Sequence, residues 1–369
     1  MSNIFIDLTS LCRKLTGIEN YAYNLVYNMI QTDVENRYIL MFRKFINMEF
    51  NALRRGNDEV ALSPFRSQLL TEQIFIPFYL RKVRPDLAFF PAFPPGFFVY
   101  CPAAFIMYDV AMWKYANCLS LKNKLYFKPL SELAAKRARC VLTISESSKK
   151  ELVQVFPFLS GKVTNIAAGL PKFDIDKSYN HALKQLPKTN YLLMVGSVEP
   201  RKNMPFAVES IAELLHEKKL FLYIVGRVAW GSQRLSDLIR QKSLQQHVKI
   251  LGYVAKDELS VLYSNAVALI FPSLHEGFGF PILEAFKHNC PVITSNISSM
   301  PEVAGDAAIF INPYDGESLR AAVSELLDNE NLRASLQEKG RQQLKIFSWE
   351  KSAQLALNAF RMNVFKQKT

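Results

Sequence analysis

The chain has 369 residues, of which 49% are hydrophobic and 21% charged, and it carries a formal net charge of +12. This composition is typical of a folded globular protein whose length favours two domains, which excludes disordered and repeat architectures. Five separated cysteines without a Cys-x-x-Cys motif, and an N-terminus without a signal-peptide pattern, predict a protein of the reducing cytoplasm.

The first half of the chain predicts a helix at 17–30 and short strands, at 4–6, 38–42, 87–90, 104–107 and 140–144. Residues 87–108 carry no charge and are long enough to cross a bilayer as a helix. They also contain four prolines, which a membrane helix would not tolerate. We therefore interpret this stretch as two buried strands joined by an aromatic loop.

A basic stretch covers residues 111–150, where nine Lys or Arg stand against only two acids, Glu132 and Glu146. Aromatic residues are interleaved with these bases. The combination suits nucleic acid or an anionic membrane surface. A solvated helix face explains the pattern equally well.

The second half alternates short apolar runs with helical patterns. Strands are predicted at 191–195, 220–225, 248–251, 267–271, 291–294 and 308–311, and helices at 203–215, 257–265, 280–286, 301–303 and 317–327. This alternation is typical of an α/β domain with a parallel sheet and crossover helices. A stretch poor in apolar periodicity, 169–190, resembles a linker between two halves of similar size.

The motif richest in chemistry spans residues 271–284. A predicted strand leads into a turn containing Gly277 and Gly279, and a helix starts near Pro281, where proline is tolerated. The exposed N–H groups at such a helix start suit a phosphate. Glu276 and Glu284 would repel a phosphate, so we expect them to accept hydrogen bonds from hydroxyl groups; for Glu284 alone, helix capping is the simpler explanation.

A second motif, residues 195–203, also joins a strand to a helix. It carries Arg201 and Lys202, two cations placed to meet a diphosphate. Arginine binds phosphate oxygens through a two-pronged guanidinium, whereas lysine acts as a point charge. The five histidines show no metal-ligand spacing, so no metal site is predicted.

Taken together, several strings resemble family 4 of the glycosyltransferases. They are Phe271–Ser273, the two glutamates, Glu199–Asn203, Gly252–Val254, Ser299–Ala308, Thr16–Ile18 and Phe347–Trp349. The resemblance implies a GT-B fold, in which two Rossmann-like domains face each other across a cleft. It implies an acceptor-binding domain at 1–172, a nucleotide-sugar-binding domain at 173–348, and a last helix, 349–369, that crosses back to the first domain.

The resemblance also assigns roles to residues of this chain. Arg201 and Lys202 match the cations that neutralise the donor diphosphate, Glu284 the ribose ligand, and Glu276 the residue that faces the donor sugar. The turn residues that match the sugar and phosphate contacts are Gly277, Phe278, Gly279, Phe280 and Pro281. Gly17 matches the glycine that lets the N-terminal loop approach the diphosphate, and Tyr253 and Val254 are expected near the nucleobase.

One pair departs from the pattern of many relatives. Where they have His-Asp after the fourth strand of the first domain, this chain has Tyr108 and Asp109. Tyrosine can donate to a sugar hydroxyl but is a much poorer base at neutral pH. We therefore place Tyr108, Asp109 and Glu276 as the residues nearest the chemistry. Either Asp109 makes the polar contacts that the histidine makes in relatives, or the site needs little help from a protein base because the leaving phosphate deprotonates the acceptor.

The function implied by the resemblance is retaining transfer of a hexose or deoxyhexose from a nucleotide sugar to a glycan or polyprenyl-diphosphate-linked acceptor. Residues 199–203 and 226–230 resemble the mannosyl- and rhamnosyl-transferring branch of O-antigen and other polysaccharide synthesis, which favours mannose from GDP-mannose. No metal or cofactor is expected. We expect a cytoplasmic protein, peripheral at the inner face of the cytoplasmic membrane, that binds no nucleic acid.

Two alternatives stay open at this point. Tyr108 would also suit a non-catalytic relative that binds a nucleotide sugar without transferring it. The net charge of +12 would suit a protein that binds nucleic acid with a steep salt dependence.

Overall fold

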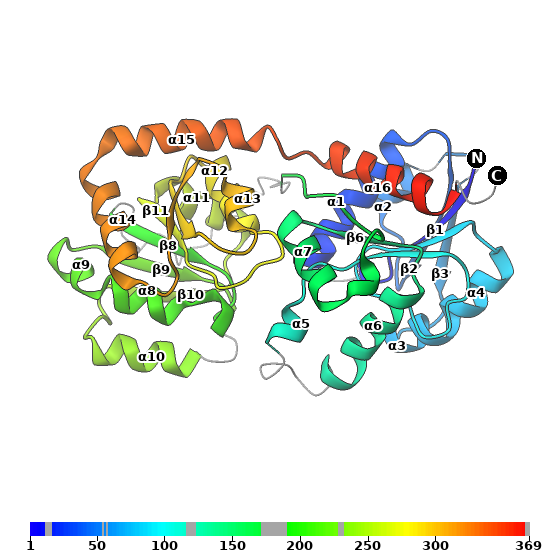
Figure 1. The fold of residues 1–369 in the computed structure, drawn as a ribbon, viewed down its shortest axis with the longest axis horizontal. Helices are drawn as coiled ribbons and strands as arrows, with labels where there is room; N and C mark the ends of the chain where they lie inside the picture. The colour runs from blue at the N-terminus through cyan, green and yellow to red at the C-terminus, as the bar shows by residue number, and fades with distance from the viewer. Residues whose placement is uncertain are drawn as a thin grey trace. The chain divides into compact units, whose positions relative to one another are not determined.

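The structure is a computed structural model that describes residues 1–11, 17–53, 55–56, 58–115, 123–170, 190–227 and 232–365. Thr16, residues 228–230 and most of the predicted linker lie outside this part of the chain. The chain divides into two compact units (Figure 1). Unit 1 comprises Met1–Gly169 and Phe347–Thr369, and unit 2 comprises Leu170–Ile346.

Unit 1 is built on a parallel sheet with the strand order β3-β2-β1-β4-β5-β6-β7. The strands are β1 (Asn3–Asp7), β2 (Arg37–Arg43), β3 (Glu59–Ser63), β4 (Leu87–Phe90), β5 (Ala103–Ile106), β6 (Cys140–Thr143) and β7 (Val163–Asn165). Its helices are α1 (Gly17–Thr32), α2 (Met48–Ala52), α3 (Gln68–Leu70), α4 (Ile76–Val83), α5 (Ala111–Lys114), α6 (Lys128–Arg137), α7 (Glu146–Val155) and α16 (Trp349–Asn363).

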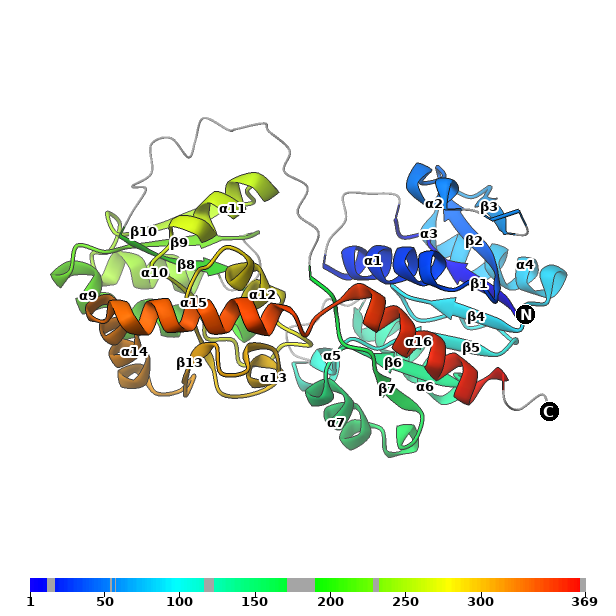
Figure 2. The same ribbon diagram turned by 90° about the horizontal axis from the view of Figure 1, so that it is seen from above.

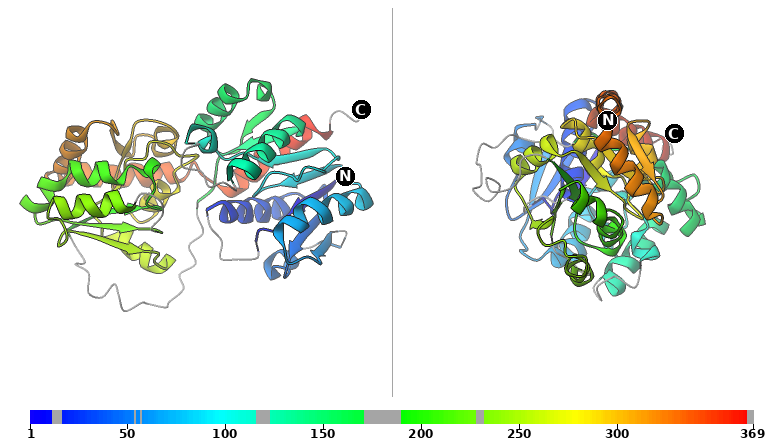
Figure 3. Two further views of the ribbon diagram at one scale, coloured as in Figure 1. Left: turned by 90° about the horizontal axis from the view of Figure 1, so that it is seen from below. Right: turned by 90° about the vertical axis from the view of Figure 1, so that its left-hand side faces the viewer.

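Helices cover both faces of the sheet of unit 1 (Figures 2 and 3). Neighbouring residues of a strand point to opposite faces of the sheet, so each strand contributes side chains to both layers. Phe90 points into a core shared with helices α4, α6 and α7. Phe89 points the other way and contacts Phe360 of α16, with ring centroids 5.1 Å apart. The chain end thus completes the core of unit 1, where α16 packs along α1.

Unit 2 is a parallel sheet with the order β10-β9-β8-β11-β12-β13. The strands are β8 (Tyr191–Val195), β9 (Phe221–Val225), β10 (Val248–Gly252), β11 (Ala268–Phe271), β12 (Val292–Ser295) and β13 (Ala308–Ile311). Its helices are α8 (Met204–Ser210), α9 (Ala212–Glu217), α10 (Ser232–Gln241), α11 (Lys256–Asn265), α12 (Phe280–Lys287), α13 (Met300–Ala304), α14 (Gly316–Asp328) and α15 (Glu330–Leu344).

The predicted α/β class, with two parallel sheets, is confirmed. The single helix predicted at 203–215 is wrong in one respect, because it breaks at Ile211 into α8 and α9. Just before the break, the hydroxyl of Ser210 donates to the carbonyl of Phe206, and Gly316 packs against that serine. None of the described helices combines the length and the apolar character that a bilayer-spanning segment needs.

Candidate functional site

The turn after β11 has a backbone that depends on glycine. Gly279, the residue before α12, has φ 116°, a value that residues with a side chain rarely adopt. Pro281 stands at the start of the helix, where the missing N–H costs nothing. Gly277 and Phe278 are buried, and Phe280 and Pro281 are half-buried. The predicted turn and helix start are therefore both present, and together they form one largely buried corner.

A serine from the next connection holds this corner. The Ser299 hydroxyl lies 3.0 Å from the Glu276 carbonyl and 2.6 Å from the Phe278 carbonyl. The neighbouring Ser298 hydroxyl lies 3.1 Å from the Glu276 nitrogen and 3.0 Å from its carbonyl oxygen. The serine at the start of the 299–308 string therefore shapes the turn, a role that the sequence analysis did not assign to it.

The two predicted cations lie at the same corner. Lys202 Nζ lies 2.5 Å from Glu276 Oε1, and Arg201 Nη1 lies 2.8 Å from Glu276 Oε2. The backbone joins them too, because the Leu274 nitrogen donates to the Arg201 carbonyl at 2.7 Å. Sheet order explains the meeting: β8 pairs directly with β11, so the turns that follow both strands are neighbours.

Lys202 is buried to an unusual degree for a lysine, with only 8% of its surface exposed. Its ammonium lies 4.9 Å from the centre of the Phe271 ring, which provides a cation–π contact. Gly196 leaves room for the stem, since a Cβ there would lie 3.1 Å from Lys202 Cε. The site thus holds a positive charge away from water beside the glycine turn.

We expected Glu276 to accept hydrogen bonds from hydroxyl groups. In the structure its carboxylate instead pairs with both cations, Arg201 and Lys202. Burial alone would raise the pKa of Glu276, but Lys202 and Arg201 together lower the pKa to about 2. Arg201 also pairs with Glu199, at 3.0 Å. The carboxylate is therefore charged at neutral pH, and it balances one of the two cations in a place with little solvent.

Glu284 lies on α12 and has a different environment. Its Oε2 accepts a hydrogen bond of 2.9 Å from the hydroxyl of Tyr263, a fully buried residue of α11. Burial raises the pKa of Glu284, and the Tyr263 hydrogen bond offsets this only in part. The sequence analysis missed Tyr263; the signal was a tyrosine on the apolar face of a predicted helix, whose hydroxyl must find a buried partner.

Tyr253 and Val254 follow β10. The Tyr253 side chain is 76% exposed, and Val254 is half-buried. The strand ends beside them approach closely, since a Cβ on Gly226 would lie 2.0 Å from the Gly196 carbonyl oxygen. Glycine directly after β8 and again after β9 was the sequence signal for this contact.

The remaining predicted residues belong to unit 1. Gly17 opens α1, and in the described part of the chain no atom beyond its chain neighbours would lie within 4 Å of a Cβ at this position. The Tyr108 hydroxyl donates to the carbonyl of Pro91 at 2.7 Å, and an Asp109 oxygen accepts from the Ala111 nitrogen at 2.8 Å. Both side chains thus have structural partners within their own unit. Among the described residues, no cluster of three or more His, Cys, Asp or Glu could hold a metal ion.

Comparisons with known proteins identify relatives of this chain. The O-antigen chain mannosyltransferase B of Escherichia coli is 31% identical over 232 residues, which cover 61% of each chain. The O-antigen chain mannosyltransferase RfbU of Salmonella typhimurium is 30% identical over 220 residues, which cover 60% of this chain and 59% of that protein. The matched stretch thus spans about three fifths of the length of these relatives.

Solved structures share the fold along the whole chain. A sucrose-phosphate synthase from Thermosynechococcus elongatus aligns over 100% of both chains with a TM-score of 0.71 and 16% identity. WaaG, a glycosyltransferase involved in lipopolysaccharide biosynthesis, aligns over 97% of this chain and 98% of its own, with a TM-score of 0.67 and 15% identity. Residues 177–343 match the family model described as glycosyl transferases group 1, and the chain as a whole has the fold of the GT-B glycosyltransferases.

Proposed function

We propose that the protein is a retaining glycosyltransferase that moves a hexose, with mannose favoured, from a nucleotide sugar to a glycan or lipid-linked acceptor in polysaccharide synthesis. The observation that carries the proposal is the convergence of Arg201, Lys202 and Glu276 on the Gly277 turn at the start of α12. The two relatives described above are named as O-antigen mannosyltransferases, which supports mannose and this class of acceptor.

In this proposal unit 2 binds the donor. Arg201, Lys202 and the N–H groups at the start of α12 would take the diphosphate, and the turn from Gly277 to Pro281 would hold phosphate and sugar. Glu284 would accept hydrogen bonds from the ribose, with Tyr253 and Val254 near the base. Two cations in a poorly solvated corner can carry the charge of the leaving nucleotide, so we propose that catalysis needs no metal.

Glu276 would change partners during donor binding. It holds both cations in the structure, at 2.5 and 2.8 Å. A diphosphate brings the competing negative charge, and the carboxylate would then turn to the hydroxyl groups of the sugar. Binding of the diphosphate and recognition of the sugar would thereby be coupled through one residue.

The transfer would take place on one face of the sugar. The bond from the anomeric carbon to the phosphate oxygen breaks as the bond to the acceptor oxygen forms, and the acceptor proton passes to the departing phosphate. This route needs no protein base. It is therefore compatible with a Tyr108 hydroxyl whose proton is already donated to the carbonyl of Pro91. Unit 1 would bind the acceptor and contribute Gly17, Tyr108 and Asp109 near the reacting groups.

A titration of GDP and GDP-mannose into the protein tests the donor site. Arg201→Ala and Glu284→Ala should each weaken binding about 10- to 100-fold, because each removes a hydrogen bond to a charged group. Arg320→Ala removes an exposed arginine of the same unit that pairs with Glu213, and it should leave binding unchanged. Equal affinities in all three variants would refute the donor site, and a panel of GDP-, UDP-, dTDP- and ADP-sugars would identify the preferred base.

A second candidate function is a non-catalytic nucleotide-sugar-binding protein, which the bonded hydroxyl of Tyr108 favours. The two functions differ in turnover. An enzyme should release GDP from GDP-mannose when a lipid-linked or glycan acceptor is added, with retention visible in the anomeric signal of the product and activity preserved in EDTA. A non-catalytic relative would bind GDP-mannose and release no GDP with any acceptor.

A further inference from the structure

Two wide turns of helix meet in unit 1. They are the π-helical turns η1 (Thr71–Phe75), which leads into α4, and η3 (Asn123–Phe127), which leads into α6. The side-chain nitrogen of Gln73 in η1 donates to the hydroxyl of Tyr126 in η3, at 2.8 Å. π-helical turns are rare and occur frequently at functional sites. Two such turns in direct contact therefore mark this part of unit 1 as a candidate binding site.

The contact lies near the carboxyl edge of the parallel sheet. The side-chain nitrogen of Gln68, just before η1, donates to the Thr9 hydroxyl at 3.1 Å, and Thr9 lies two residues beyond the end of β1. Ligands of open parallel sheets bind outside the carboxyl ends of the strands. β5, which precedes Tyr108, lies two places from β1 in the sheet, which is about 10 Å at the usual spacing of strands. A short glycan can therefore span from this cluster to Tyr108.

Glu72 is the charged member of the cluster. It is only 7% exposed, and its carboxylate accepts a hydrogen bond from the same Gln68 nitrogen. Burial raises the pKa of Tyr126, and the charge of Glu72 raises that pKa further, so the carboxylate lies close to the contact between the two turns. A carboxylate that shares its surroundings with an amide and hydroxyl groups can accept hydrogen bonds from the hydroxyl groups of a sugar, while its neighbours donate.

Two polar atoms of this region are buried and have no hydrogen-bond partner in the described part of the chain. They are the side-chain oxygen of Gln68 and the hydroxyl of Ser10, the residue after Thr9. The orientation of the Gln68 amide is fixed by Glu72, because an amide oxygen turned toward the carboxylate would be repelled. Buried polar atoms without a partner are rare in folded proteins. Hydroxyl groups of a ligand would supply the missing hydrogen bonds.

Aromatic side chains extend from the contact between the two turns. The Tyr126 ring lies 6.2 Å from that of Phe97 and 5.1 Å from that of Phe127, measured between centroids. Phe127 in turn lies 6.0 Å from Phe93, and all four rings are half-buried. Gln73 also accepts a hydrogen bond from the Phe97 nitrogen at 3.0 Å, which holds the aromatic loop after β4 against η1. Aromatic walls with a few well-placed polar groups are typical of small-ligand sites, and a sugar ring offers apolar C–H faces to such walls.

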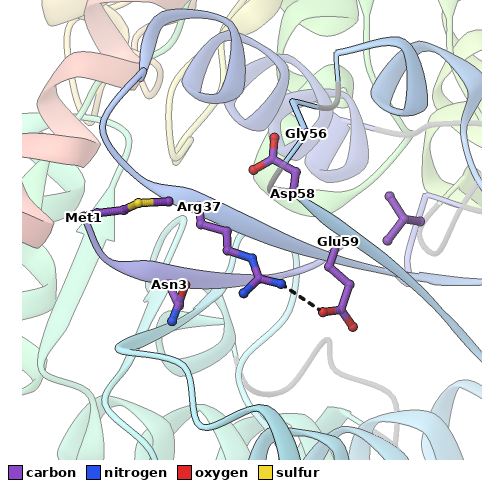
Figure 4. Close-up of a pocket in the computed structure, with 7 residues that line it drawn as sticks. Met1, Asn3, Arg37, Gly56, Asp58 and Glu59 are labelled. Atoms are coloured by element: carbon purple, nitrogen blue, oxygen red, sulfur yellow. Dashed lines mark hydrogen bonds and ion pairs between the residues drawn. The ribbon is translucent and has the colours of Figure 1, made fainter.

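A pocket at the opposite edge of the same sheet provides a contrast (Figure 4). It has a volume of about 590 Å³, and its lining includes Arg37 and Glu59, which begin β2 and β3. Figure 4 shows Arg37 turned toward Glu59, and their charged atoms lie 3.4 Å apart. Asp58 accepts from the backbone nitrogens of Tyr38 and Arg55, at 2.8 and 3.0 Å. The charged groups of this pocket thus have partners within the protein, so the pocket offers little to a ligand.

We propose that the cluster at the carboxyl edge is a subsite for the acceptor glycan, in which Glu72 and Gln68 bind hydroxyl groups of a neutral sugar near the reacting end and Tyr126 stacks on its ring. This inference rests on the proposed function and names the class of acceptor. A carboxylate accepts hydrogen bonds but cannot donate them, so it favours a free hydroxyl group and repels a phosphate. Glu72 would therefore determine specificity for a neutral sugar at this position.

Binding of free oligosaccharides tests the subsite without a donor. The full chain is titrated with three neutral trisaccharides, built from mannose, glucose or N-acetylglucosamine, and binding is followed by saturation-transfer NMR. We expect at least one of them to bind. Glu72→Gln should weaken its binding about 10-fold, because a hydrogen bond to a charged group is lost. The matched control Glu59→Gln removes the same charge from the pocket of Figure 4 and should change binding less than twofold.

Ser10→Ala gives a result that a purely structural role would not produce. The variant should bind the trisaccharide about fivefold less tightly while its Tm stays the same or rises, because the lost hydroxyl has no partner among the described residues. A lower Tm with unchanged trisaccharide binding would count against the subsite. In a transfer assay, Glu72→Gln should raise the acceptor KM about 10-fold and change kcat less than threefold, since the residue lies away from the reacting atoms.

Two outcomes would overturn the proposal outright: no binding of any of the three trisaccharides, or equal losses of binding in Glu72→Gln and Glu59→Gln. GDP titrations of Glu72→Gln and Ser10→Ala should match the unaltered protein, because neither residue is assigned to the donor. Failure of the donor site would appear as an absence of GDP binding in the unaltered protein. The two results are therefore distinguishable.

Discussion

Glu276 and Glu284 flank the same glycine turn but have opposite environments. Glu276 is paired with two cations, which lower its pKa to about 2 in spite of its burial. Glu284 accepts a hydrogen bond from the Tyr263 hydroxyl, and burial raises its pKa. The comparison shows that one residue type has two electrostatic environments here: two cations keep Glu276 charged, whereas burial favours the protonated form of Glu284. In the proposed function, Glu276 would compete with the diphosphate and Glu284 would accept hydrogen bonds from the ribose.

The largest effect is expected when Lys202 is replaced. Lys202→Met would leave Glu276 buried with Arg201 as its remaining cation, and breaking one side of a buried pair costs about 3 to 5 kcal/mol. Urea denaturation should show this loss in the free energy of unfolding. Adding Glu276→Gln to Lys202→Met should restore part of it; a double variant less stable than the single one would show that Glu276 does not depend on Lys202.

Glu276→Gln should lower the transfer rate while it strengthens product binding. The amide lacks the charge that holds the two cations, so GDP should bind several-fold tighter. Loss of a contact made to the reacting sugar should reduce kcat about 100-fold. Glu199→Gln, which removes the other carboxylate beside Arg201, is the matched control and should keep kcat within about threefold. Weaker GDP binding in Glu276→Gln would contradict the exchange of partners.

The pH dependence of stability should also separate the two glutamates. For Glu276 the folded pKa lies below the usual 4.5, so its contribution of about 3 kcal/mol is complete above pH 4.5 and disappears as the pH falls toward 2. For Glu284 the folded pKa is raised, so stability declines as the pH rises from 4.5 through that pKa. Glu276→Gln should remove the first dependence and Glu284→Gln the second, in urea titrations between pH 3 and 7.

The smallest effect is expected from Tyr263→Phe. The ring keeps its place, and Glu284 loses one hydrogen bond, which is worth about 1 kcal/mol. GDP should bind about fivefold less tightly, and the pH midpoint of GDP binding should move upward because the carboxylate has lost a donor. Tyr223→Phe, a buried tyrosine in β9, is a suitable control. A change in Tm without a shift in the pH midpoint of GDP binding would show that Tyr263 acts through packing alone.

Much of the fold could be predicted from local patterns. The apolar runs at 87–90 and 191–195 are strands with these same bounds, β4 and β8. The edge strand β3 was missed, because its sequence Glu59–Ser63 mixes polar and apolar residues and only Ser63 is buried. The short strand β7 was missed as well, since three residues give no readable period.

The candidate site was less accessible to sequence reasoning. Each motif could be placed at the end of a strand, but its neighbours depend on sheet order. Arg201 follows β8 and Glu276 follows β11, and only the crossover that pairs these strands brings the residues together. The contact between Tyr263 and Glu284 likewise joins two helices, α11 and α12, whose packing no local pattern specifies.

The glycines that end β8 and β9 have a wider consequence. Because a Cβ on Gly226 would lie 2.0 Å from the Gly196 oxygen, no larger residue can be accommodated without parting the two strand ends. Arg201 and Lys202 stand on the turn that leaves the first of these ends. The close approach of the two strand ends therefore sets the point at which this turn leaves the sheet. If the proposed function holds, new donor preferences should arise through the exposed loop at Tyr253 and not through this framework.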